Sequence, residues 1–211
     1  LVTNGSLIDR DFAKVLKENN ISVSLSLDGF PKDNDKARVF KRDFTTGTFK
    51  EIIRGYKILT EEGIDKIGIS YTIGSHNINN LEKSVEFILD NLHIGGMAFN
   101  FMIDFPCGKN PFSVDIDLAT EKALKTFELL RERGIYEDRI MRKLKPFVEK
   151  RMHLSDCGAI GNQIVLAPNG DIGICHGFLS SKKYFTHNVL KEDNIDLEND
   201  AAFKEWNNRF P

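Results

Sequence analysis

Three stretches of the sequence decide the fold: Ser22–Leu27 (SVSLSL), Ile67–Ile73 (IGISYTI) and Met97–Ile103 (MAFNFMI). In each stretch, bulky apolar residues alternate with small or polar residues, which is the period of a β-strand with two unlike faces. Helix-like segments separate the stretches, so the order is that of parallel βαβ units. Parallel strands that are covered by helices on both faces usually read as continuous apolar runs. The polar second face therefore predicts a curved, barrel-like α/β sheet with helices outside and a ligand-holding hollow inside.

An antiparallel sheet with one solvated face is the alternative. Crossover connections are favoured over it, because the spacing of apolar residues predicts helices over 9–18, 48–63 and 79–95. Thr48 and Glu51 have the spacing of a capping box at the start of the second of these helices.

The second half of the chain changes its pattern. Residues 115–152 have helical spacing that predicts two helices, one that ends at Gly134 and a second over about 140–148 with Pro146 as a kink. Residues 163–175 then predict a β-hairpin around an Asn169-Gly170 turn. A short helix is expected over 199–209.

Composition and charge limit the classes of partner. The 211 residues contain 29 Lys and Arg against 31 Asp and Glu, a formal net charge of −2. This balance favours neither a nucleic-acid nor a membrane partner, and no apolar run approaches the roughly 20 residues of a membrane-spanning helix. Three cysteines fit the reducing cytosol better than a disulfide framework. We therefore expect a cytoplasmic protein.

Cysteines flank the predicted hairpin. Cys157 and Cys175 could share a metal ion or an iron–sulfur cluster, since thiolates are soft ligands. Two buried free cysteines are the alternative for this pair. A zinc site completed by His176 and His187 is weaker, because neither spacing matches a zinc motif. Cys107 reads as a loop thiol without a role.

Asp28 follows the second predicted strand, in an Asp-Gly pair. It could bind a ribose or a cation, but a turn residue is the simpler interpretation. A different α/β-barrel enzyme could use Asp28, Asn100 and Asp104 for acid–base or metal chemistry. No glycine-rich phosphate loop accompanies these residues.

Several pieces of the sequence together resemble one family. Leu1–Ile8, Val23–Gly29 with Asp35 and Arg38 downstream, and Thr46–Phe49 resemble the middle of radical S-adenosylmethionine (SAM) enzymes that mature peptides and proteins. Further along, three more pieces resemble the start of the SPASM extension: Cys157–Ala159, Ile164–Ile172 and Cys175–His176. In that family the SPASM extension holds auxiliary iron–sulfur clusters.

The resemblance implies a fold and a chemistry. It implies a partial (β/α)6 TIM-like barrel over residues 1–112, a helical bridge over 113–156 and a truncated SPASM-like region over 157–211. It also implies S-adenosylmethionine and 4Fe-4S clusters as cofactors of the parent enzyme. That parent would modify a peptide or protein side chain through a 5′-deoxyadenosyl radical.

Site residues follow from the same resemblance by position. Ser26 and Arg38 match places where the family contacts S-adenosylmethionine, and Asn4 and Asn77 are weaker candidates beside this cofactor. Cys157 and Cys175 match the first ligands of the auxiliary cluster. His176 stands where the sulfatase-maturing branch has an acid that serves as base, which favours a peptide maturase and makes His176 the catalytic candidate.

The family's C-x-x-x-C-x-x-C loop, which holds the cluster that cleaves S-adenosylmethionine, is absent from these 211 residues. We therefore expect an internal fragment that is catalytically inactive by itself and that need not bind a cofactor. A non-catalytic peptide-binding module on a half-barrel scaffold is the alternative function.

Overall fold

The computed structural model describes residues 1–41, 43–102, 104, 108–151, 158–159, 163–179 and 181–209. The chain divides into two compact units, Leu1–Val148 and Glu149–Pro211. Each unit has its own sheet and its own buried apolar core.

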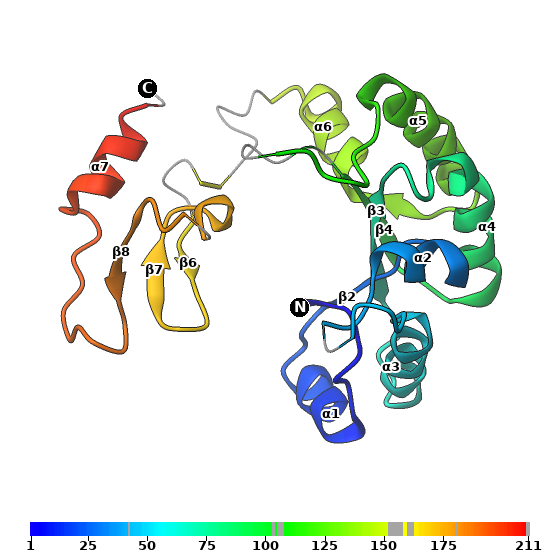
Figure 1. The fold of residues 1–211 in the computed structure, drawn as a ribbon, viewed down its shortest axis with the longest axis horizontal. Helices are drawn as coiled ribbons and strands as arrows, with labels where there is room; N and C mark the ends of the chain where they lie inside the picture. The colour runs from blue at the N-terminus through cyan, green and yellow to red at the C-terminus, as the bar shows by residue number, and fades with distance from the viewer. Residues whose placement is uncertain are drawn as a thin grey trace. The chain divides into compact units, whose positions relative to one another are not determined.

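A five-stranded parallel sheet forms the centre of the first unit (Figure 1). Its strands pair in chain order, and every pair is parallel. They are β1 (Val2–Thr3), β2 (Val23–Ser26), β3 (Ile67–Ile73), β4 (Gly96–Phe101) and β5 (Tyr136–Glu137). The parallel pairing confirms the α/β prediction and excludes the antiparallel alternative. The two helices predicted within 115–152 did not include β5 between them, because two strand residues between two helices give no readable period.

Helices follow the strands of this sheet, and all but the last helix connect one strand to the next. They are α1 (Arg10–Glu18), α2 (Pro31–Ala37), α3 (Phe49–Glu61), α4 (Leu81–Asn91), α5 (Ile116–Glu132) and α6 (Asp138–Glu149), with a short 3-10 turn, η1 (Ile78–Asn80), before α4. Helix α3 packs on β2, and α5 packs on α4, β4 and β5. In Figure 1, α3, α4 and α5 lie along one side of the strands.

The two faces of strands β2, β3 and β4 differ in exposure, as the alternation predicts. The buried side chains under the helices are Val23, Leu25, Ile67, Ile69, Tyr71, Ile73, Met97 and Phe99. Burying each of the aliphatic ones contributes about 1.5–3 kcal/mol. The residues of the other face are half-buried: Ser24, Ser26, Gly68, Ser70, Thr72, Ala98 and Asn100. We call this second set the polar face.

Two predicted helix starts behave differently in the structure. Asp9 caps α1 as an N-cap residue should, accepting the backbone N–H of Phe12. The capping box at α3 was wrong, since the Thr48 side chain makes no cap hydrogen bond. Asp35 accepts the Phe49 N–H at 2.8 Å instead, and the Thr48 hydroxyl donates to the Arg38 carbonyl at 3.2 Å.

A three-stranded antiparallel sheet forms the second unit. It contains β6 (Val165–Leu166), β7 (Asp171–Gly173) and β8 (Phe185–Asn188), with a 3-10 turn, η2 (His176–Phe178), and helix α7 (Ala201–Asn207). The β6–β7 pair confirms the predicted hairpin, and β8 was not predicted. The rings of Phe178, Tyr184 and Trp206 meet edge-to-face in its core.

The three-part division at residues 112/113 and 156/157 stays a prediction, although α5 and α6 belong to the same compact unit as the parallel sheet. In the part of the chain that the structure describes, no helix is long and apolar enough to cross a membrane.

Candidate functional site

The polar face carries a chain of side-chain hydrogen bonds across neighbouring strands. Asn100 of β4 donates to the Ser70 hydroxyl of β3 at 3.1 Å, and Arg139 at the start of α6 donates to the Asn100 side-chain oxygen at 2.9 Å. An open cavity of about 680 Å³ lies at the amino-terminal half of these strands, and Ser24, Ser70 and Arg139 are among its lining residues. The sheet is therefore hollowed at this end, and a few polar side chains lie in a lining that is otherwise mostly apolar, as in ligand-binding pockets.

An ion pair between a buried carboxylate and a half-buried guanidinium lies at the opposite, carboxyl-terminal end of β2. Asp28 is 1% exposed, and both of its carboxylate oxygens accept from Arg38: Oδ2 from Nε at 2.6 Å and Oδ1 from Nη2 at 3.0 Å. Two parallel bonds of this kind fix the plane of a guanidinium as well as its position. Arg38 Nη2 also donates to the Thr72 hydroxyl at 3.1 Å, so the pair is tied to the polar face.

The Asp28 carboxylate also continues the sheet where strand pairing stops. Strand β2 ends at Ser26, which is paired with Ser70. Two residues further along β3, the backbone N–H of Thr72 donates to Asp28 Oδ1 at 2.8 Å. Because this N–H is satisfied by a side chain, the carboxylate is held by both the backbone of β3 and the guanidinium.

Buried amides hold the main chain of Asp28. Its N–H donates to the side-chain oxygen of Asn34 at 3.1 Å, and its carbonyl accepts from Asn77 at 3.4 Å. Gly29 follows with φ +101°, and a Cβ there would lie 2.7 Å from the Ser84 Cβ and 2.8 Å from the Tyr71 hydroxyl. Only glycine fits at this turn.

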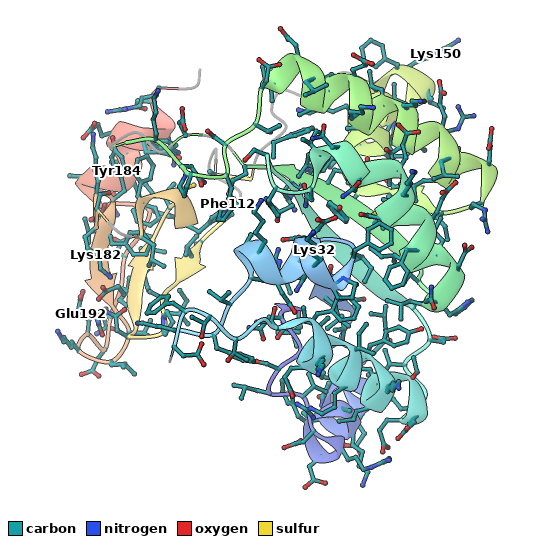
Figure 2. All side chains as sticks on the ribbon, turned by 45° about the vertical axis from the view of Figure 1, so that its right-hand side comes forward. Lys32, Phe112, Lys150, Lys182, Tyr184 and Glu192 are labelled. Atoms are coloured by element: carbon teal, nitrogen blue, oxygen red, sulfur yellow. The ribbon has the colours of Figure 1, made fainter. Side chains whose placement is uncertain are left out.

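His76 lies in the loop after β3. It is 8% exposed, its ring meets that of Phe112 edge-to-face at 5.0 Å, and neither ring nitrogen has a hydrogen-bond partner among the described residues. Phe112 is labelled in Figure 2. Burial lowers the pKa of His76, and the nearby Asp28 and Asp33 carboxylates only partly oppose the shift.

The structure places the predicted cofactor residues at different depths. Ser26 is half-buried on the polar face, and Arg38 is half-buried in its ion pair with the buried Asp28. Asn77 is buried, and its amide is occupied by the loop: it donates to the Thr72 carbonyl at 2.8 Å and accepts the Gly74 N–H at 2.9 Å. Asn4 is exposed and accepts from the Ser6 N–H and hydroxyl.

The predicted metal and catalytic residues belong to the second unit. Cys175 is half-buried, and its Sγ accepts the Gly177 N–H at 3.4 Å. His176 is exposed at the start of η2. Cys157 and Cys107 lie outside the described residues. Within the described ranges, no three His, Cys, Asp or Glu side chains are grouped to hold a metal ion.

His187, the residue weighed for zinc, has carboxylate partners instead. Its Nδ1 lies 2.6 Å from Glu192 Oε2, and its Nε2 lies 3.2 Å from Asp200 Oδ2. The hydrogen bond with Glu192 raises the pKa of His187 above its ordinary value.

Sequence reasoning missed the role of Asp28 in this arrangement. An Asp-Gly pair after a strand predicts a turn, and Arg38 lies ten residues away, across a helix (α2) that the sequence analysis did not predict. Asn100 and Asp104 also do not join Asp28 in one cluster: Asn100 bonds Ser70, and Asp104 accepts the Asn110 N–H at 2.9 Å.

The sequence is similar to a known family and to named proteins. Residues 1–88 match the family model of the Radical SAM superfamily. The chain is 36% identical over 132 residues to an Fe-coproporphyrin III synthase from Methanosarcina barkeri, covering 62% of this chain and 31% of that protein. It is 30% identical over 105 residues to a cysteine-type anaerobic sulfatase-maturating enzyme from Clostridium novyi, covering 50% of this chain and 26% of that protein. The chain thus spans less than a third of either relative.

The fold matches a solved structure over nearly its whole length. The structure titled "Native anSMEcpe with bound AdoMet and Cp18Cys peptide" superposes with a TM-score of 0.80 at 20% identity, covering 98% of this chain and 58% of that one. This likeness confirms the partial-barrel fold, on which the ion pair and the polar face stand. Residues 1–88, the part of the chain that matches the Radical SAM superfamily model, contain both Ser26 and Arg38.

Proposed function

We propose that this chain is part of a radical SAM enzyme that modifies a side chain of a peptide or protein. The observation that carries the proposal is the Asp28–Arg38 pair, with its buried carboxylate and half-buried guanidinium, beside the polar face and within the residues that match the Radical SAM model. A guanidinium is the side chain best suited to a carboxylate, and the carboxylate is the anionic group of S-adenosylmethionine. The donor set therefore fits this cofactor, which with its cluster supplies the radical for hydrogen abstraction when bound.

The proposed roles divide between the two units. In the first unit, Ser26 and Arg38 contact the cofactor directly, and Asn4 and Asn77 lie beside it. Asn77 acts by shaping the loop, since its amide is already engaged there. In the second unit, Cys175 and Cys157 are the first ligands of an auxiliary 4Fe-4S cluster. The Gly177 N–H on Cys175 Sγ supports this role, because such bonds stabilise a thiolate.

The peptide substrate is supported by the neighbours. One relative is named a sulfatase-maturating enzyme, and the solved structure holds a peptide. We propose that His176, exposed beside Cys175, takes or directs a proton at the substrate. We propose further that the chain alone is inactive, because the C-x-x-x-C-x-x-C loop is absent from its sequence.

The test uses the longer protein that contains this sequence, reconstituted anaerobically with iron and sulfide. We expect 5′-deoxyadenosine to form from S-adenosylmethionine, and the 211-residue chain to form none. Replacing Cys175 by Ser should lower the iron content, whereas Cys107→Ser, the matched control, should leave it unchanged. Absence of 5′-deoxyadenosine from the longer protein contradicts the proposal and leaves the non-catalytic peptide-binding module.

A porphyrin substrate is the second candidate, because the relative with 36% identity is named an Fe-coproporphyrin III synthase. The two substrates separate in one assay. A peptide substrate changes the mass of candidate peptides encoded near the gene. A porphyrin-forming activity instead produces the visible absorption of newly formed Fe-coproporphyrin from an added iron tetrapyrrole precursor.

A further inference from the structure

We propose that Asp28 is a positioning residue that holds Arg38 so that its Nη1 edge meets the carboxylate of S-adenosylmethionine. This inference rests on the proposed function, in which Arg38 contacts that cofactor. Asp28 itself touches no ligand in this account, because its side chain is 2% exposed and both carboxylate oxygens accept hydrogen bonds.

The Arg38 guanidinium has three nitrogens, and two of them have hydrogen-bond acceptors in the structure. Nε and Nη2 donate to Asp28, and Nη2 donates also to Thr72. In the described part of the chain, nothing accepts a hydrogen bond from Nη1. The Arg38 side chain is 25% exposed, so the guanidinium is accessible only in part. A fixed guanidinium with one unassigned edge is suited to an anionic ligand that approaches along that edge.

The rigidity of Asp28 makes the placement of Arg38 reproducible. Its N–H is bound by Asn34, its carbonyl by Asn77, and its Oδ1 by the Thr72 N–H. A free arginine side chain would lose considerable rotamer freedom on binding a ligand. Because the bidentate pair has already fixed that freedom on folding, the cofactor binds a preorganised donor.

The mechanism predicts an effect confined to one end of the cofactor. The amino-carboxylate end of S-adenosylmethionine meets Arg38, whereas the adenosine end does not depend on it. 5′-Methylthioadenosine has the adenosine and the sulfur but lacks the amino-carboxylate. Loss of Asp28 should therefore weaken binding of S-adenosylmethionine and leave binding of 5′-methylthioadenosine unchanged.

The experiment measures dissociation constants of both ligands for the cluster-loaded longer protein by anaerobic equilibrium dialysis. Asp28→Asn keeps the shape of the side chain but removes its charge and one acceptor oxygen. We expect Asp28→Asn and Arg38→Met each to weaken S-adenosylmethionine binding by about tenfold to a hundredfold. The double variant should match Arg38→Met within about twofold, because Asp28 acts through Arg38.

Asp33→Asn is the matched control. Asp33 is also buried, lies on α2, and accepts from Asn80 at 3.0 Å rather than from Arg38. We expect both dissociation constants of this variant to stay within about twofold of wild type. If Asp28→Asn fails to fold, Thr72→Val replaces it, since this change removes a bond to Arg38 and keeps the Thr72 N–H. Thr72→Val should weaken binding of S-adenosylmethionine alone.

The outcomes separate the two proposals. Wild-type protein that does not bind S-adenosylmethionine overturns the proposed function and this inference with it. Wild-type protein that binds it, together with an Asp28→Asn variant that binds it equally well, overturns the inference alone. Equal weakening of both ligands by Asp28→Asn assigns Asp28 a merely structural role and also overturns the inference.

Discussion

Glu137 accepts the backbone N–H of Phe99 at 2.9 Å, and this bond joins β5 to β4 through a side chain. The same carboxylate accepts the N–H of Arg139 at 3.2 Å and that of Ile140 at 2.6 Å, in the first turn of α6. Glu137 is fully buried. One side chain thus joins β5 to β4 and accepts hydrogen bonds from unpaired N–H groups in the first turn of α6.

Replacing Glu137 by Ala should lower the free energy of unfolding by about 2–3 kcal/mol, because one buried and two partly buried N–H groups lose their acceptor. Glu137→Gln keeps one acceptor oxygen and should cost less. Urea denaturation followed by circular dichroism measures both values. Variants that unfold at the wild-type midpoint would show that water replaces the carboxylate without cost.

Gly29→Ala should lower the free energy of unfolding by about 2–4 kcal/mol, because the new methyl group meets Ser84 and Tyr71 at a positive φ. Gly134→Ala is the matched control: its φ is +71°, but no atom lies within 4 Å of the added Cβ. We expect it to cost only about 1–2 kcal/mol from the backbone strain. Equal losses in the two variants, measured by thermal unfolding, would contradict the steric argument.

His76 should make the protein less stable in acid. Its pKa is lowered from 6.5 by burial, so the unfolded chain binds more protons than the folded chain below about pH 6.5. Stability should fall as the pH decreases from about 6.5 through the folded pKa, and be constant above 6.5 as far as this group is concerned. The measurement is the pH dependence of the unfolding midpoint of wild type minus that of His76→Gln. A flat difference would contradict the assignment.

His187 should have the opposite effect. Its pKa is raised from 6.5, mainly by the hydrogen bond with Glu192, so the folded chain binds the proton more tightly. Its contribution is fully present below about pH 6.5 and is lost as the pH rises through the raised folded pKa. An NMR titration of the His187 ring measures that pKa, which Glu192→Gln should lower. Glu192 is labelled in Figure 2. An unshifted titration in wild type would contradict the ion pair.

The sequence was most informative where a structural feature depends only on residues that are neighbours in the chain. Alternation along Ile67–Ile73 predicted both the strand and its two faces, because burial follows directly from the period of two. The start of α3 was harder to predict, because Asp35 reaches the Phe49 N–H from fourteen residues away. Local patterns predict local bonds, and a distant acceptor that fits better displaces them.

The residues of the candidate site also differ in whether the sequence could predict them. Arg38 was found through the resemblance of its surrounding pieces, but its partner Asp28 could not be, since no local pattern links two residues across the unpredicted helix α2. The roles of Glu137 and Asn34 were not predicted for the same reason: their side chains accept hydrogen bonds from backbone N–H groups outside their own elements. Such contacts depend on three-dimensional packing, which a single sequence does not encode in any short window.

The alternation of exposure in β2, β3 and β4 also follows residue parity. In all three strands the buried residues have odd numbers, and the polar face has even numbers. A random mutational library across these strands should therefore separate by parity. Substitutions at odd positions would reduce the amount of folded protein in the cell. Substitutions at even positions would leave that amount unchanged and alter only ligand binding.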